Sequence, residues 1–156
     1  MSKKYLVAGA TGLMGTMLVN QIPLNEDVTV IARRKINYKR PVQFLNLDEY
    51  IKLPHADHLF ICLGYPLELR DLLLMRESIK AKFKAVDYNL VIKIAEAAKQ
   101  SNIKSVSVIS SIEAHPKSLN YYLKVKGQME NKIEELGFEA LIYLGLVICL
   151  VKEKKR

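Results

Sequence analysis

The order of hydrophobic and polar positions divides the chain into short apolar runs and longer amphipathic stretches. Helical spacing is clearest over 86–100, where Leu90, Ile94 and Ala97 share a face, and over 119–136, which stops before Gly137. Near-continuous apolar strands that alternate with helices are typical of a parallel sheet covered on both faces, so the pattern predicts a doubly wound α/β fold. The six runs with the length and composition of strands are 5–8, 28–32, 42–45, 59–63, 106–110 and 140–143.

Length and composition fit a single globular domain. The chain has 156 residues, of which 50% are hydrophobic and 26% charged, and it contains no internal repeat, low-complexity tract or linker. The weakest pattern lies over 65–83. No apolar run reaches the roughly 18 residues of a membrane helix, and residues 1–4 lead directly into the first strand. We therefore expect a cytoplasmic protein without a membrane span.

Cysteine spacing and charge distribution count against a metal site and a nucleic-acid site. Cys62 and Cys149 lie in apolar runs without metal-ligand spacing, which predicts reduced, buried thiols and no metal site. The net charge of +8 comes largely from basic residues within 33–40 and 152–156. Because no helix carries a basic stripe with interleaved aromatic residues, a solvated basic surface is favoured over nucleic-acid binding.

The first candidate site is a glycine turn between the first strand and a helix. The segment reads Gly9-Ala10-Thr11-Gly12-Leu13-Met14-Gly15 and is followed by helical spacing through Leu18 and Ile22. In such a turn the first glycine allows a tight bend, the second lets a pyrophosphate approach the backbone, and the third lets the helix pack closely. The helix N-terminus then faces the anion. Glycines also mark ordinary turns, so the neighbouring features decide the interpretation.

Two other strand ends add to this interpretation. The second strand ends at Arg33 and Arg34, where a dinucleotide fold meets the adenosine ribose, and guanidinium groups suit a 2′-phosphate. NADP(H) is therefore favoured over NAD(H), with an exposed basic turn as the alternative. After the fourth strand, Leu63 and Gly64 would let a cofactor lie against backbone, although Gly64 equally fits a simple turn.

A third group of residues points to proton transfer. Ser110 and Ser111 end the fifth strand, and Tyr122 precedes Lys126 by one helical turn. That spacing places both side chains on one helix face, where a cation makes a phenol a usable general acid or base. A serine hydroxyl at the strand end could hold a substrate carbonyl. Tyr122 could also be a packing residue, because a tyrosine and a lysine at this spacing are common by chance.

Together, the glycine turn, Ser110-Ser111 and Tyr122-x-x-x-Lys126 resemble the short-chain dehydrogenase/reductase superfamily. Within it, 86–88, 95–98, 122–127 and Glu130 resemble the atypical, NmrA-like group of the Tat-interacting-protein oxidoreductases. The resemblance implies an NAD(P)-binding Rossmann fold and Tyr122 as proton donor or acceptor. It also implies that Lys126 binds the nicotinamide ribose and tunes Tyr122, and that Ser111 or Ser110 orients the carbonyl. Asp87 stands where many members have asparagine, which puts a water relay at this position in doubt.

The chain departs from the family after the sixth strand. Members of the family continue there with Arg-Pro-Gly and several dozen residues around the substrate, whereas this chain has the divergent segment 144–156. Residues 144–147 can be encoded TTA GGC CTG GTT, and reading from the third base gives AGG CCT GGT, which encodes Arg-Pro-Gly. We therefore interpret 1–143 as the Rossmann domain and 144–156 as a tail created by a frameshift near Tyr143, with a role as the last strand as the alternative.

Three functions follow from these observations. The first is an NADP(H)-dependent oxidoreductase for a small carbonyl or alcohol that the sequence does not identify. The second, ranked after it, is a non-catalytic NADP(H) sensor or interaction module with a protein partner. The altered C-terminal segment adds weight to this second function, because the substrate-covering part is missing. The third is a basic nucleic-acid-binding protein, which the sequence ranks last.

Overall fold

The computed structural model describes residues 2–46, 52–67, 71 and 75–146. Its strands form one parallel sheet with the order β3-β2-β1-β4-β5-β6. The predicted doubly wound α/β fold is thereby confirmed. The strands are β1 (Lys4–Ala8), β2 (Asp27–Ala32), β3 (Gln43–Asn46), β4 (His58–Ile61), β5 (Ser105–Ser111) and β6 (Ala140–Leu146).

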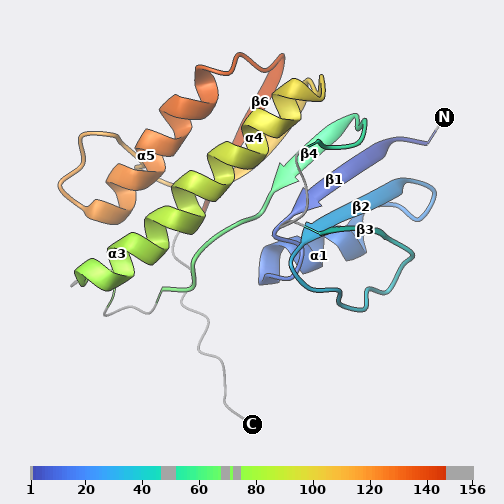
Figure 1. The fold of residues 1–156 in the computed structure, drawn as a ribbon, viewed down its shortest axis with the longest axis horizontal. Helices are drawn as coiled ribbons and strands as arrows, with labels where there is room; N and C mark the ends of the chain where they lie inside the picture. Colours follow the sequence, from blue (N-terminus) through green and yellow to red (C-terminus); the bar gives the residue numbers. More distant parts are fainter. Residues whose placement is uncertain (1, 47–51, 68–70, 72–74, 147–156) are drawn as a thin grey trace, which may run out of the picture.

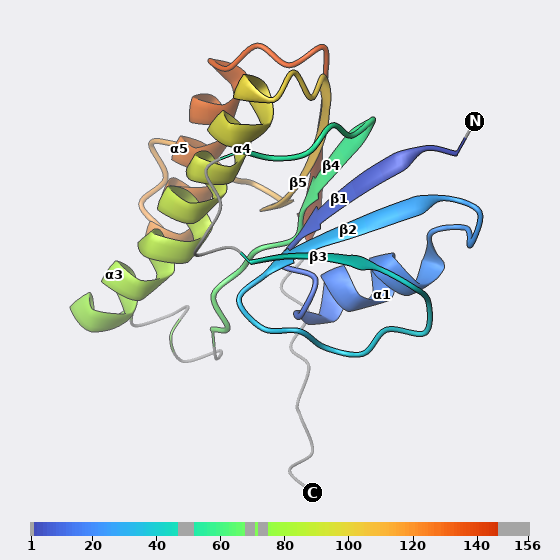
Figure 2. The ribbon, with the colours of Figure 1, turned by 45° about the vertical axis from the view of Figure 1, so that its right-hand side comes forward.

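The helices lie on both faces of this sheet. Helix α1 (Leu13–Gln21) packs on one face beside β1 and β2. On the other face lies a continuous helical rod made of α3 (Glu77–Lys84), the π-helical segment η1 (Ala85–Leu90) and α4 (Val91–Gln100), with α5 (Tyr121–Glu134) beside it (Figures 1 and 2). The chain reverses its strand order between β1 and β4, so the carboxyl ends of these strands form the edge where α/β sheets bind ligands.

Each face of the sheet has its own hydrophobic core. The α1 side buries Val7, Val19 and Val30, and the side of the helical rod buries a larger cluster around Leu59, Ile94 and Met129. Strand residues alternate between these clusters, because successive side chains point to opposite faces. The two-sided burial explains why the strands appear in the sequence as nearly continuous apolar runs.

Two elements extend beyond their predicted limits. The rod begins at Glu77, inside the weakly patterned stretch, whereas the sequence predicted a helix from residue 86. Strand β6 continues past Tyr143 to Leu146 and pairs with the end of β5, so the start of the predicted tail belongs to the sheet. The rest of that tail, with Cys149 and the basic residues 152–156, lies outside the described residues.

Candidate functional site: a cleft at the strand ends

The glycine turn has the geometry that its sequence predicts. Gly9 has a φ of +77°, and a Cβ there would lie 2.5 Å from the Cys62 carbonyl oxygen. A Cβ on Gly15 would collide with the Gly9 carbonyl and lie 2.7 Å from the Ala10 Cα, so α1 packs directly against the turn. At Gly12 a Cβ would meet only the Gly9 oxygen, at 3.4 Å. Gly9 and Gly15 thus shape the turn, whereas Gly12 leaves its outer side open.

The turn is also fixed by hydrogen bonds to Ala10. The Ala10 carbonyl accepts bonds from the Thr16 hydroxyl at 2.8 Å and from the Tyr38 hydroxyl at 3.1 Å. Burial raises the pKa of Tyr38, which keeps this phenol protonated as a donor. Of the other predicted turn residues, Leu13 and Met14 start α1 with exposed side chains, 61% and 39% accessible. They lie beside the turn rather than in the hollow above it.

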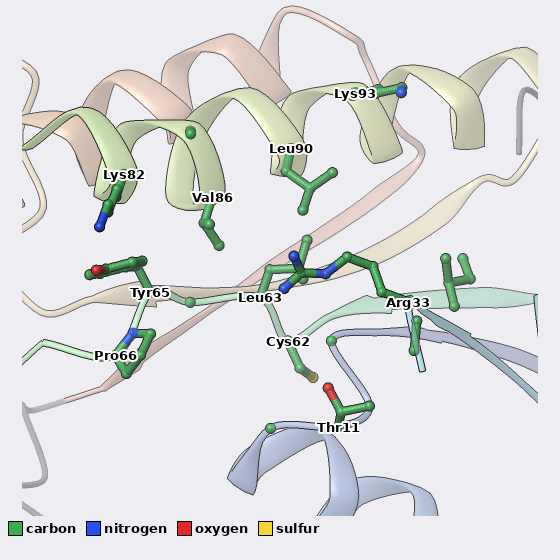
Figure 3. Close-up of a pocket in the computed structure, with 16 residues that line it drawn as sticks. Thr11, Arg33, Cys62, Leu63, Tyr65, Pro66, Lys82, Val86, Leu90 and Lys93 are labelled. Atoms are coloured by element: carbon green, nitrogen blue, oxygen red, sulfur yellow. The ribbon is translucent and has the colours of Figure 1, made fainter. Parts of the chain in front are cut away.

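A cleft of about 670 Å³ opens above the turn, between the strand ends and the helical rod. Figure 3 shows Arg33 extending across it, with Thr11 on the turn side and Leu90 on the helix side. The cleft therefore brings together the ends of β1, β2 and β4, as the sequence predicted. Its lining comprises Gly9, Thr11, Gly12, Ile31, Ala32, Arg33, Cys62, Leu63, Gly64, Tyr65, Pro66, Lys82, Ala85, Val86, Leu90 and Lys93.

The charged residues of the cleft differ in part from the predicted set. Both predicted arginines are exposed, but Arg33 lines the cleft and Arg34 does not. Lys82 and Lys93 also line the cleft, from α3 and α4. Neither lysine belongs to a motif, so the sequence did not point to them. Among the described lining residues there is no carboxylate. The cleft therefore suits an anionic ligand.

Arg40 is buried and does not belong to the basic surface on which its neighbours lie. Its guanidinium donates hydrogen bonds to the backbone carbonyls of Ile22, Pro23 and Glu26, just after α1. The role of Arg40 is thus structural, because it satisfies carbonyl groups at the end of a helix.

The two serines at the end of β5 point to different partners. Ser110 is fully buried and donates a hydrogen bond to the Glu130 carboxylate on α5. Ser111 donates to the Ile112 carbonyl at 3.2 Å. Ser111 is also buried, at 8% exposure, but its hydroxyl is not held by a carboxylate, so it is the better candidate for a substrate-orienting hydroxyl.

Helix α5 carries the other two predicted catalytic residues. Its N-terminus is capped by Asn120, whose side chain accepts a hydrogen bond from the Leu123 N–H at 3.2 Å. Tyr122 follows in the first turn, with its ring 5.2 Å from the ring of Phe83 between centroids. Gly127 allows this helix to lie directly against the backbone of His115 and Pro116 in the preceding loop. The middle of α5 is thereby held against the loop that follows β5.

Lys126 is buried and engaged in an ion pair. Its Nζ lies 2.8 Å from the Asp87 Oδ1 and donates to the Ile109 carbonyl at 3.2 Å. The other Asp87 oxygen accepts the Tyr65 N–H at 2.7 Å. Burial raises the pKa of Asp87, against the opposing attraction of Lys126. The sequence pointed to Asp87 by its position but not to this direct contact, which joins two distant segments.

Cys62 is a free, half-buried thiol at the end of β4. Burial raises its pKa to about 11, so it stays protonated at neutral pH. Cys62 is thus half-buried rather than buried as predicted, and it lines the cleft. Its reduced state stays a prediction.

Comparison with known proteins identifies the relatives of this chain. HTATIP2 from Rattus norvegicus is 32% identical over 99% of the chain, and the mitochondrial protein FMP52 from Debaryomyces hansenii is 27% identical over 96% of it. The chain belongs to the HTATIP2 and FMP52 group. It spans 66% of the length of HTATIP2 and 68% of that of FMP52. No family model matches the chain.

Solved structures show that this HTATIP2-like chain has the Rossmann fold of nucleotide-binding proteins. MoeE5, solved with UDP-glucuronic acid and NAD, superposes with a TM-score of 0.72 at 18% identity and covers 91% of the chain. A putative NAD-dependent epimerase/dehydratase from Bacillus halodurans gives a TM-score of 0.68 at 15% identity over 92% of the chain. The chain covers 54% and 70% of these two proteins.

Two findings bear on where the protein is located in the cell. Within the described residues, every helix is too short or too polar to cross a membrane. The FMP52 relatives are named as mitochondrial proteins, so the cytoplasmic location expected from the sequence stays a prediction.

Proposed function

We propose that this chain binds NADP(H) in the cleft and acts as an oxidoreductase on a small carbonyl or alcohol. The observation that carries the cofactor preference is Arg33, which extends from the end of β2 into a cleft with no carboxylate among its described lining residues. A 2′-phosphate at this end of the cleft would bind the guanidinium through charge-assisted hydrogen bonds. The glycine turn would receive the pyrophosphate against its backbone.

In the proposed reaction the cofactor supplies or accepts a hydride, and the protein's residues handle the proton. Tyr122 would exchange a proton with the substrate oxygen, which the Ser111 hydroxyl would hold. Lys126 would bind the nicotinamide ribose from its buried position between Asp87 and the Ile109 carbonyl. Support comes from the contact of Lys126 with the Ile109 carbonyl of β5. Ser111, Tyr122 and Lys126 are not among the described residues that line the cleft, so the substrate would bind beside it.

The cofactor preference is tested by the adjacent pair Arg33 and Arg34. Because only Arg33 lines the cleft, Arg33→Ala should weaken NADPH binding about 10- to 100-fold, as expected for the loss of charge-assisted bonds of roughly 1.5–3 kcal/mol. Arg34→Ala is the matched control and should cost much less. Neither change should alter NADH binding appreciably. Equal affinity of the unmodified chain for NADPH and NADH in a fluorescence titration would refute the preference.

The ion pair favours a second candidate, the non-catalytic NADP(H) sensor. Asp87 neutralises the charge of Lys126 directly, which weakens the electrostatic support that an active tyrosine would receive. The two candidates differ in the effect of Tyr122→Phe. Under the enzymatic proposal this change abolishes NADPH oxidation with a panel of small carbonyl compounds but leaves NADPH affinity nearly unchanged. In a sensor, the unmodified chain would bind NADPH without turning over any of them.

A further inference from the structure

We propose that Asp87 is a positioning residue that connects the wall of the nucleotide cleft to Lys126. One carboxylate oxygen would hold the cleft loop in its binding shape, while the other holds the lysine of the reaction centre. The proposal rests on the proposed function for the nature of the ligand, but the two contacts exist without it.

The contacts place Asp87 between two segments that are distant in sequence. Its Oδ2 accepts the Tyr65 N–H at 2.7 Å, and its Oδ1 meets Lys126 Nζ at 2.8 Å. The side chains of Asp87 and Lys126 are both only 3% exposed. Gly64 lies close as well, because a Cβ there would be 3.9 Å from the Asp87 Oδ1. The carboxylate therefore fixes the loop backbone after β4 and the lysine of α5 at once.

The helical segment that carries Asp87 also forms part of the cleft. Ala85, Val86 and Leu90 of η1 line the cleft, together with Gly64 and Tyr65 of the loop that Asp87 holds. A π-helical turn is rare and often occurs at functional sites, because it turns side chains away from the ordinary helical faces. In η1, one short segment thus contacts both the cofactor cleft and the reaction centre.

A carboxylate suits both partners in the positions that they occupy, one at each oxygen. Each partner is a donor, so the residue between them must accept twice, and an ionised aspartate has no hydrogen to oppose either donor. An asparagine would present an NH₂ group to one of them. The buried ion pair alone would require only one oxygen, which makes the bond to the Tyr65 N–H the distinguishing feature of this proposal.

Amide hydrogen exchange tests the hold on the loop without any cofactor. In Asp87→Ala, the Tyr65 amide should exchange at least about tenfold faster than in the unmodified chain, because its acceptor is gone. Asp57→Ala is the matched control, since the Asp57 carboxylate accepts the Lys4 N–H at 2.8 Å at an exposed site. It should leave the Tyr65 amide unchanged. Equal exchange of Tyr65 in the unmodified chain and in Asp87→Ala would overturn the proposal.

Comparison with Lys126→Met separates positioning from a merely structural ion pair. Lys126→Met leaves a buried, unpaired carboxylate, and adding Asp87→Ala removes that charge, so the double variant should unfold at a higher temperature than Lys126→Met alone. The double variant should nevertheless bind NADPH about tenfold more weakly than Lys126→Met does, because the Tyr65 N–H of the loop has lost its hydrogen-bond acceptor. A structural ion pair predicts the same gain in stability without this loss of affinity, and that result would overturn the proposal.

The two lines of measurement keep this inference apart from the proposed function. Should the unmodified chain fail to bind NADPH, the proposed function fails, while the exchange of the Tyr65 amide still decides whether Asp87 holds the loop. Should Asp87→Ala fail to fold by itself, the exchange is measured in the double variant against Lys126→Met, in which Asp87 is still present. Faster exchange in the double variant supports the proposal, and unchanged exchange refutes it.

Discussion

At the scale of single residues, the glycines of the turn differ in what an added methyl group would meet. A Cβ on Gly15 would collide with the backbone of Gly9 and Ala10, whereas one on Gly12 would be 3.4 Å from a single oxygen atom. We expect Gly15→Ala to lower the free energy of unfolding by about 1–3 kcal/mol, as overpacking does. Gly12→Ala should unfold like the unmodified chain but bind NADPH at least about tenfold more weakly, because its methyl group would occupy the path of the pyrophosphate.

Urea unfolding and NADPH titration of both glycine variants check this prediction. Each variant serves as the control for the other, since both add one methyl group to the same turn. Equal losses of stability in the two variants would contradict the distinction between a packing glycine and a ligand-facing glycine.

At the scale of elements, Arg40 joins the end of α1 to the segment before β3. Its buried guanidinium donates to the carbonyls of Ile22, Pro23 and Glu26. Its loss would remove the Arg40 donors from all three, and within the described residues only the Pro23 carbonyl would keep a backbone donor, the Glu26 N–H. We therefore expect Arg40→Ala to cost about 2–4 kcal/mol of unfolding free energy, from several charge-assisted hydrogen bonds. The neighbouring Lys39 is exposed, and Lys39→Ala should change stability by less than about 0.5 kcal/mol. A loss in Arg40→Ala no larger than that in Lys39→Ala, in thermal or urea unfolding, would rule out this role.

The elements also show which parts of the fold the sequence predicts. Strands β1 and β2 were predicted because their runs are apolar and buried on both faces, and that signal is local. Strand β5 was predicted from its β-branched residues, although serines alternate with them. Helix α3 was missed because it is short and mostly polar and buries only Phe83, so too few apolar positions mark it in the sequence. The π-helical turn was missed for another reason, since its Asp87 meets partners from two other segments and local spacing does not encode such contacts.

The candidate site also contains residues that the sequence predicts and residues that it does not. Gly9, Gly12, Arg33 and Gly64 could be predicted because strand ends in a doubly wound sheet meet at one edge. Lys82 and Lys93 could not, because their place in the cleft depends on how the rod of α3, η1 and α4 lies over the sheet. For the serines, alternation along β5 left both candidates open, and only the Glu130 contact with Ser110 distinguishes them.

At the scale of the whole molecule, the two faces of the sheet differ in their cover. Within the described residues, α3, η1, α4 and α5 cover one face and α1 lies on the other, beside β1 and β2. Ile142 and Leu144 of β6 remain 49% and 45% exposed.

The side chain of His58 on β4 has polar neighbours on β5. Its ring nitrogens lie 2.7 Å from the Ser105 hydroxyl oxygen and 2.8 Å from the Ser107 hydroxyl oxygen. This half-buried imidazole links the stability of the fold to pH.

Burial lowers the pKa of His58, so the folded chain binds this proton less readily than the unfolded chain does. The contribution of His58 to the free energy of unfolding is therefore fully present above the ordinary histidine pKa of about 6.5. It is lost as the pH falls through the lowered pKa of the folded chain. We expect urea unfolding to show decreasing stability from about pH 7 to pH 5, and His58→Gln should flatten this dependence. His55→Gln, at an exposed position, should retain it. If His58→Gln lost stability with falling pH as steeply as the unmodified chain, another group would have to carry the pH dependence.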